Sequence, residues 1–141
     1  MANRGNEVLS GTDGTVWVNG EEWAEVKALE AKVTGEFEDI NFCGDYNTYK
    51  RFMGRTGEGT ITLLKTSSRG AKIMAQAFKT GVMPEIKIVT KLTNKQTGKS
   101  ERAVIKDIVF SEFNLAKFEN RSIVEEELPF TFSDYDYIEM I

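Results

Sequence analysis

The stretch VEEELPFTF (residues 124–132) alternates apolar and polar side chains, and this pattern decides the fold class. Alternation with a period of two is typical of a half-buried β-strand. One face carries the apolar residues Val124, Leu128, Phe130 and Phe132, and the other carries Glu125, Glu127 and Thr131. Because Pro129 has no N–H to donate, we expect this strand at the edge of a sheet.

A hairpin signal lies near the start of the chain. The apolar run Thr15-Val16-Trp17-Val18 meets Asn19-Gly20, which tolerates the positive φ angles of a type I′ turn. We expect a return strand from Glu21 onward. Residues 23–37 have alanines that favour a helix, but their alternation favours a strand with a bulge between Ala28 and Leu29.

One helix is predicted after a strand at 59–65. Ser67 or Ser68 can cap it, and Gly81 followed by Pro84 is a typical stop signal. Its apolar stripe has helical spacing and consists of Ile73, Met74, Ala77 and Phe78.

The rest of the chain indicates further strands, so the protein is mainly β. Residues 86–92 alternate, and a turn follows at 94–98. Between residues 103 and 118 apolar side chains fall on both parities, which predicts one long strand buried on both faces.

A glycine-rich segment with apolar side chains interrupts this pattern at about 40–58. We predict a long loop there, and loops of this length are usually functional or disordered. Its aromatic and basic residues are candidates for docking on another surface, namely Phe42, Tyr46, Tyr49, Lys50, Arg51, Phe52 and Arg55. Breaker residues scattered through 1–14 predict a flexible N-terminal arm, and 15–141 forms one domain.

Composition excludes several functions. The 141 residues contain no histidine and one cysteine, Cys43, which removes histidine-based catalysis, common zinc sites and intrachain disulfides. A net charge of −4 disfavours specific nucleic-acid binding, which needs clustered Lys and Arg. There is no signal-peptide pattern and no run of about 20 apolar residues. We expect a protein made and kept in the cytoplasm, without catalytic residues, cofactor or metal.

Four stretches together resemble the XkdM-like phage tail tube family. They are NGEEWA (19–24), GEGTIT with Lys65 (57–62), DIVF (107–110) and EEELPFTFSDYD (125–136). The resemblance spans nearly the whole chain, and the last block is its most specific part.

This resemblance implies an antiparallel β-sandwich or barrel with one flanking α-helix. Six copies would close into a ring whose inner wall is a continuous sheet, and the segment 40–58 would make the ring-on-ring contact. Glu125 and Glu127 are candidates for lumen charge, since like charge lets DNA slide without sticking. The implied partners are further copies and the sheath, baseplate and tape-measure proteins of a virion or tail-like particle, with no membrane insertion by the monomer.

Simpler or different interpretations remain open. A carboxylate run is more often a solvated face than a lumen lining. The cations Lys50, Arg51 and Arg55 serve either a contact with an acidic patch of the next ring or solubility alone. For the whole chain the alternatives are a headless phage-tail bacteriocin, a type VI secretion-like tube protein, and a small-molecule carrier or enzyme with a β-barrel pocket. The ending Pro129-Phe130-Thr131-Phe132 favours the phage branch.

Overall fold

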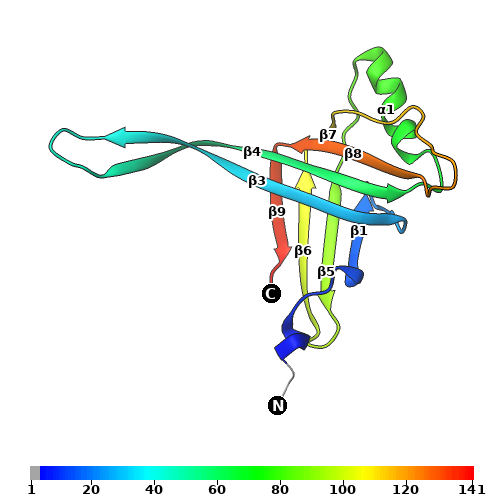
Figure 1. Cartoon of the computed structure of the whole chain (residues 1–141), viewed down its shortest axis with the longest axis horizontal. Helices are drawn as coiled ribbons and strands as arrows, with labels where there is room; N and C mark the ends of the chain where they lie inside the picture. The colour runs from blue at the N-terminus through cyan, green and yellow to red at the C-terminus, as the bar shows by residue number, and fades with distance from the viewer. Residues whose placement is uncertain (1–3) are drawn as a thin grey trace.

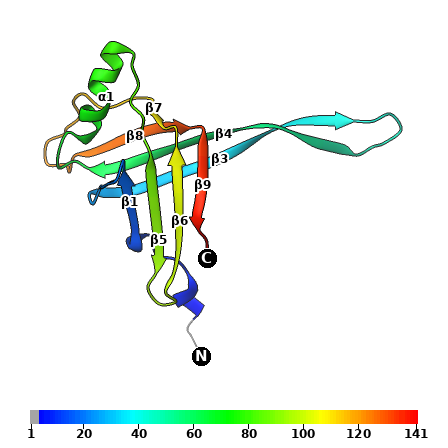
Figure 2. The ribbon, with the colours of Figure 1, turned by 180° about the vertical axis from the view of Figure 1, so that it is seen from behind.

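Two antiparallel sheets that run across one another form the body of the computed structural model, which describes residues 4–141 (Figures 1 and 2). The strands are β1 (Gly14–Val18), β2 (Glu21–Glu22), β3 (Val26–Asn41), β4 (Thr48–Leu64), β5 (Ile88–Asn94), β6 (Lys99–Lys106), β7 (Val109–Phe110), β8 (Glu125–Phe132) and β9 (Asp134–Glu139). Sheet A has the order β2-β1-β5-β6-β9, and sheet B has the order β3-β4-β8-β7. One helix, α1 (Arg69–Thr80), and the 3-10 helices η1 (Arg4–Glu7) and η2 (Gly11–Asp13) complete the elements. The mainly β fold with one helix is confirmed.

The core lies between the inner faces of the two sheets. Its most deeply buried side chains, each at most 2% exposed, include Ile61, Ile88, Ile108, Phe110, Leu128 and Phe130. In β8 the residues Leu128, Phe130 and Phe132 are buried while Glu127 and Thr131 are exposed, so the alternation predicted for 124–132 is confirmed.

Glycines in β4 make room for the phenylalanines of β8. Gly57 is the register partner of Phe132, and Gly59 is the partner of Phe130. A Cβ atom on either glycine would meet the ring of its partner at 2.7 Å or less. The two aromatic rings therefore lie directly over glycine backbone, where no side chain of β4 competes for the space.

Helix α1 begins and ends where the sequence predicts. Gly81 follows it with φ 76°, and its N–H donates to the Ala77 carbonyl at 2.8 Å, as expected for a left-handed cap. Ser68 occupies the N-cap position, but its side chain makes no capping hydrogen bond.

Charged groups fix the start of α1 instead. Arg69 donates from Nη1 to Glu21 at 2.6 Å, pairs with Glu25, and lies over the Trp23 ring at 5.3 Å. Desolvation lowers the pKa of Arg69, but the hydrogen bonds to Glu21 and Glu25 outweigh it and raise that pKa above its ordinary value. Glu126, 3% exposed, lies beside Gly70 in the first turn of α1. The helix dipole stabilises a carboxylate at this end of a helix.

The Asn19-Gly20 turn is confirmed, since its φ angles are 52° and 84°. The return strand β2 is only two residues long, however, and the chain then crosses into sheet B as β3. The strand interpretation of 23–37 is also confirmed from Val26 onward. The bulge falls between Val26 and Ala28, slightly earlier in the strand than the expected position between Ala28 and Leu29.

The expected long strand at 103–118 is wrong. β6 ends at Lys106, Asp107 turns the chain with φ 54°, and β7 joins the other sheet for two residues. Residues 111–124 then form neither strand nor helix, with Leu115 and Phe118 more than 80% exposed. The apolar residues of both parities therefore belong to two different sheets and a loop.

β8 is not an edge strand, because it lies between β4 and β7. β7 pairs only with Phe130 and Thr131, and the Pro129 carbonyl accepts a hydrogen bond from Ser111 N–H at 3.0 Å. The proline thus occupies a stretch where the ladder is short. The last strand is β9, which forms an edge of sheet A.

The first 14 residues contain local structure in their described part. Asn94 Nδ2 donates to the Asn6 carbonyl at 2.9 Å, and Lys95 pairs with Asp13 at 3.3 Å. The flexibility expected for 1–14 stays a prediction, and residues 1–3 lie outside the described residues.

Gly59→Ala should destabilise the subunit. The new Cβ would meet the Glu30 carbonyl oxygen and the Phe130 ring, and overpacking of this kind costs about 1–3 kcal/mol. Urea denaturation should show a lower free energy of unfolding. Gly11→Ala, where nothing lies within 4 Å of the added Cβ, is the matched control, and equal stability of the two variants would contradict the packing argument.

Candidate assembly surfaces

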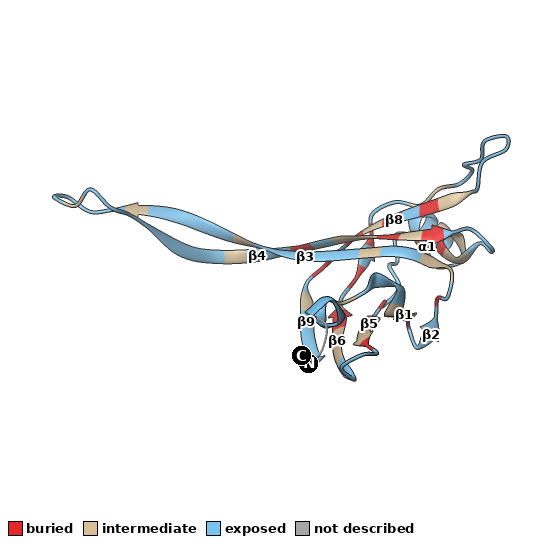
Figure 3. Ribbon diagram, turned by 60° about the horizontal axis from the view of Figure 1, so that its bottom comes forward, coloured by how far each residue is buried: buried red, intermediate tan, exposed pale blue. Residues whose placement is uncertain are grey.

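A long hairpin projects from the body, built from the distal parts of β3 and β4 (Figures 1 and 3). The two strands stay paired out to Asn41 and Thr48, so the irregular connection is limited to residues 42–47. The long loop predicted at 40–58 is therefore wrong for most of its length. Gly54 and Gly57 sit within a paired strand, whereas Gly44 lies in the connection with φ 82°. Met53 is an extra residue that shifts the register between Glu36 and Phe37.

One face of the projecting hairpin (residues 35–55) continues the inner face of sheet B. The register places Phe37 opposite Phe52 on this face, with ring centroids 5.6 Å apart. These rings are 59% and 55% exposed, because sheet A ends at β9 and does not reach them. Phe37 was not among the docking residues predicted from the sequence. Its place on the same face of the strand as Val33 and Gly35, which follows from the alternation, was the available signal.

The tip forms a second aromatic contact. Phe42 and Tyr49 lie 5.8 Å apart between centroids, and the Tyr49 hydroxyl donates to Asp45 at 2.7 Å. The Asn47 backbone N–H donates to the same carboxylate at 2.8 Å. The Asn47 and Tyr49 hydrogen bonds lower the pKa of Asp45. Tyr46 is fully exposed at the tip.

The three cations of the segment do not form one patch. Lys50 pairs with Asp39 beside the two phenylalanines, and Arg55 lies over the Tyr135 ring at 5.6 Å. Arg51 is opposite Glu38 on the other face. Arg55 thus ties the base of the hairpin to β9, while Lys50 is already neutralised within the hairpin.

Both sides of sheet B carry backbone groups without a strand partner. β3 pairs only with β4, so its 16 residues offer a long free edge. On the opposite side β7 covers only Phe130 and Thr131 of β8. Free edges of this kind are templates for pairing with another chain.

The outer face of sheet B is polar and acidic. Register pairs place four carboxylates and one lysine on it: Glu30, Glu58, Glu125, Glu127 and Lys32. The bulge residue Lys27 joins them through its ion pair with Glu125. Lys27 pairs with Glu125 at 2.6 Å and Lys32 with Glu58 at 3.3 Å. Within residues 4–141, Glu127 has no ion pair. The two candidate lumen residues therefore share one face but differ in their partners.

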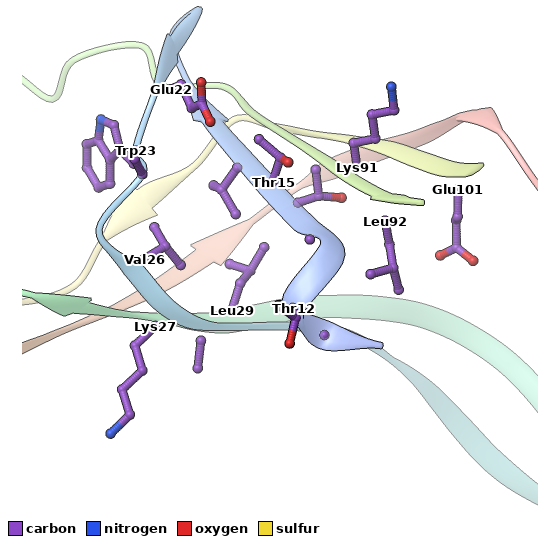
Figure 4. A pocket seen from close by; sticks show the side chains of 16 residues that line it. Thr12, Thr15, Glu22, Trp23, Val26, Lys27, Leu29, Lys91, Leu92 and Glu101 are labelled. Carbon is purple, nitrogen blue, oxygen red and sulfur yellow. The ribbon is translucent and has the colours of Figure 1, made fainter. Parts of the chain in front are cut away.

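A groove of about 760 Å³ runs along the start of β3 (Figure 4). Trp23, Val26 and Leu29 line one side. The other side is formed by β1, β5 and β6, with Val16, Leu92 and Glu101 among its residues. Because β3 is an edge strand, the inner face of sheet A extends past it without cover.

Comparison with known proteins identifies the family. The family described as "Phage tail tube protein" matches residues 1–139. The chain belongs to this family. The phage-like element PBSX protein XkdM of Bacillus subtilis (strain 168) is 31% identical over 143 residues, covering 100% of this chain and 97% of that protein.

Two solved structures have the fold of this tail tube protein at low identity. The cryo-EM structure of the anti-feeding prophage tube terminating cap gives a TM-score of 0.77 at 10% identity, covering 94% of this chain and 92% of that one. The PVC sheath-tube complex of an extracellular contractile injection system in its extended state gives 0.75 at 10% identity, covering 94% and 93%. The resemblance inferred from the four sequence stretches is confirmed.

Across residues 4–141, no group of three His, Cys, Asp or Glu residues is placed to hold a metal ion. None of the helices in this range has the length and apolar character to span a bilayer. Cys43 is exposed at the hairpin tip, and Trp23, 3% exposed, fills the core.

The tip turn should respond to acid. The pKa of Asp45 lies below the ordinary 3.8. Its ionised carboxylate therefore stabilises the tip turn fully above pH 3.8, and this stabilisation is lost as the pH falls through the lowered pKa. NMR should show the Asn47 amide resonance shifting with a midpoint below 3.8. Asp45→Asn should abolish this shift, whereas Glu38→Gln should keep it; a midpoint at or above 3.8 would contradict the hydrogen-bond assignment.

Proposed function

We propose that six copies of this tail tube protein close into a ring and that the rings stack into the tube of a contractile, phage-type tail. The observation that carries the proposal is the combination of two free edges on sheet B with one projecting hairpin. The edges suit lateral contacts, and the hairpin suits contacts along the tube. The role is structural and not enzymatic.

The lateral contact joins the β3 edge of one copy to the β7 and β8 edge of the next. Backbone hydrogen bonds supply the affinity in such strand addition. Repeating it around a ring removes all open edges of sheet B, as closure does in a barrel. Sheet B thereby becomes a continuous inner wall.

The stacking contact is made by the projecting hairpin. Its inner face carries the exposed Phe37–Phe52 pair, and its tip carries Phe42, Tyr46 and Tyr49. Clustered apolar groups of this kind on an exposed element are typical of protein interfaces. Of the cations, Arg51 is the one free to meet an acidic group of the next ring, since Lys50 pairs with Asp39 and Arg55 lies over Tyr135.

The outer face of sheet B lines the lumen in this arrangement. Glu127 contributes charge there, while Glu125 is partly neutralised by Lys27. An acidic wall repels phosphate and removes the electrostatic part of nucleic-acid binding. In a phage, DNA can then pass through the tube without being held. In a headless particle the tube carries no genome.

The partners follow from this position in the particle. The outer face of sheet A and α1 point away from the lumen, towards a contractile sheath, and the ends of the tube meet baseplate and terminating proteins. A tape-measure protein occupies the lumen during assembly. Assembly takes place in the host cytoplasm, and the tube ends in a virion or tail-like particle.

Shortening the hairpin should block stacking without unfolding the subunit. Replacing residues 40–49 by Asn-Gly keeps the Asp39–Lys50 pair and supplies a two-residue turn. Negative-stain electron microscopy at high concentration should show hollow tubes for the parent protein and no tubes for the variant.

The matched control is Cys43→Ser, which alters the tip by one exposed atom and should form tubes as the parent does. Circular dichroism checks that both variants keep the β fold. Tubes of normal length from the shortened variant would refute the stacking role of the tip, and a parent that never forms rings would refute the proposed function.

Reversing the charge of Glu127 should change how the tube treats DNA. Glu127→Lys replaces an unpaired carboxylate on the lumen face by a cation. Variant tubes assembled with DNA should therefore protect more DNA from nuclease than parent tubes do, and this difference should shrink as the salt concentration rises. Glu139→Lys makes the same change on sheet A. Equal protection by the two variants would contradict the lumen assignment.

A further inference from the structure

The loop of residues 111–124 exposes large apolar side chains. Leu115 is 88% exposed, Phe118 is 83% and Ile123 is 80%. The loop is held at its start, where Phe113 packs against Phe78 of α1 at 5.4 Å between centroids. Exposed apolar groups that gather on one segment indicate an interaction site.

The same chain carries an unfilled groove along the start of β3, in which Val26, Leu29 and Leu92 are partly exposed among polar side chains such as Lys27 and Glu101. Figure 4 shows Trp23, Val26 and Leu29 on one side of it and Leu92 on the other. Its own loop 111–124 does not line it. The groove lies on the β3 side of sheet B, and the loop leaves from the β7 and β8 side.

Register places these two features at the same height along the sheet. Leu63 is the partner of Val26 on one side and of Glu126 on the other, so β3 and β8 begin at the same level. When the β8 edge of one copy adds to the β3 edge of the next, the end of the loop at residue 124 comes to the start of the neighbouring β3. Strand tilt in a closed ring shifts neighbours by a few residues, which a loop of this length spans.

We propose that Leu115 and Phe118 of one copy fill the groove beside β3 of the neighbouring copy in the ring. This inference rests on the proposed lateral contact between β3 and β8 and names the side chains that stabilise that contact. The occupant is a second copy because the loop joins β7 to β8, the two strands that form one side of that contact. Each copy gives one loop and receives one, so the ring closes with every groove filled.

The test is cross-linking between two different variants in a Cys43→Ser background. One variant carries Leu115→Cys and the other carries Leu92→Cys, so a covalent dimer can form only between copies. Mixed subunits are assembled, examined by electron microscopy, and treated with a short bismaleimide. We expect a dimer band from assembled rings that is at least about tenfold stronger than from dilute monomers, as the local thiol concentration rises on assembly.

The matched control replaces Leu92→Cys by Thr93→Cys. Thr93 is the next residue of β5 and points to the opposite face of sheet A, so it should give little dimer with Leu115→Cys. Rings without a Leu115–Leu92 cross-link above this control would overturn the inference and leave the proposed ring intact. Failure of the Cys43→Ser parent to form rings would overturn the ring, and the inference with it.

A second pair of variants tests the contact without added thiols. The double variant Leu115→Asp with Phe118→Asp places charge on two exposed positions, so the monomer should keep its fold by circular dichroism and lose ring formation. Asn120→Asp adds charge to the same loop and should assemble. A folded double variant that forms rings as well as Asn120→Asp would overturn the proposal.

Discussion

The β3–β4 ladder is longer than the core that supports it, and this mismatch governs the rest of the structure. β4 has 17 residues, whereas the strands of sheet A have between 2 and 8. Backbone hydrogen bonds can continue without a core, but apolar side chains need cover. From Phe37 outward the inner face of the ladder has no cover within the subunit. In the proposed tube this uncovered part contacts other copies of the chain.

The packing of β8 on β4 explains why two distant stretches of sequence belong together. Gly57 and Gly59 provide flat backbone, and Phe132 and Phe130 lie over it. Either stretch without the other would leave a void or a clash. Trp23 and Arg69 add a third region, because the cation lies over the indole ring and joins α1 to the β2–β3 connection.

Turns and alternation could be predicted from the sequence because they depend on neighbouring residues. Asn19-Gly20 needs positive φ, Gly81 ends a helix, and 124–132 has one buried face. The projecting hairpin could not be predicted in the same way. Its strands contain Gly54 and exposed aromatics, which look like loop, and it is the pairing of β3 with β4 that makes them extended.

The candidate site was predicted in part. The aromatic and basic residues of 40–58 lie on the hairpin as a group, but the sequence does not reveal which face each one takes. The extra residue Met53 reverses the alternation of β4, and this brings Phe52 to the face of Phe37. The exposed residues Leu115 and Phe118 were assigned to a buried strand, because apolar spacing alone does not separate a core from an interface.

A hairpin that projects from one side of the subunit also gives any stack of rings a direction. In the proposed stack the hairpin contact is heterologous, since the donor surface on one ring meets a different acceptor surface on the next. Heterologous contacts that do not close generate open polymers. One end of such a polymer presents hairpins and the other presents their acceptors. The two ends are chemically distinct, so a protein that starts the tube and a protein that stops it need opposite complementary surfaces.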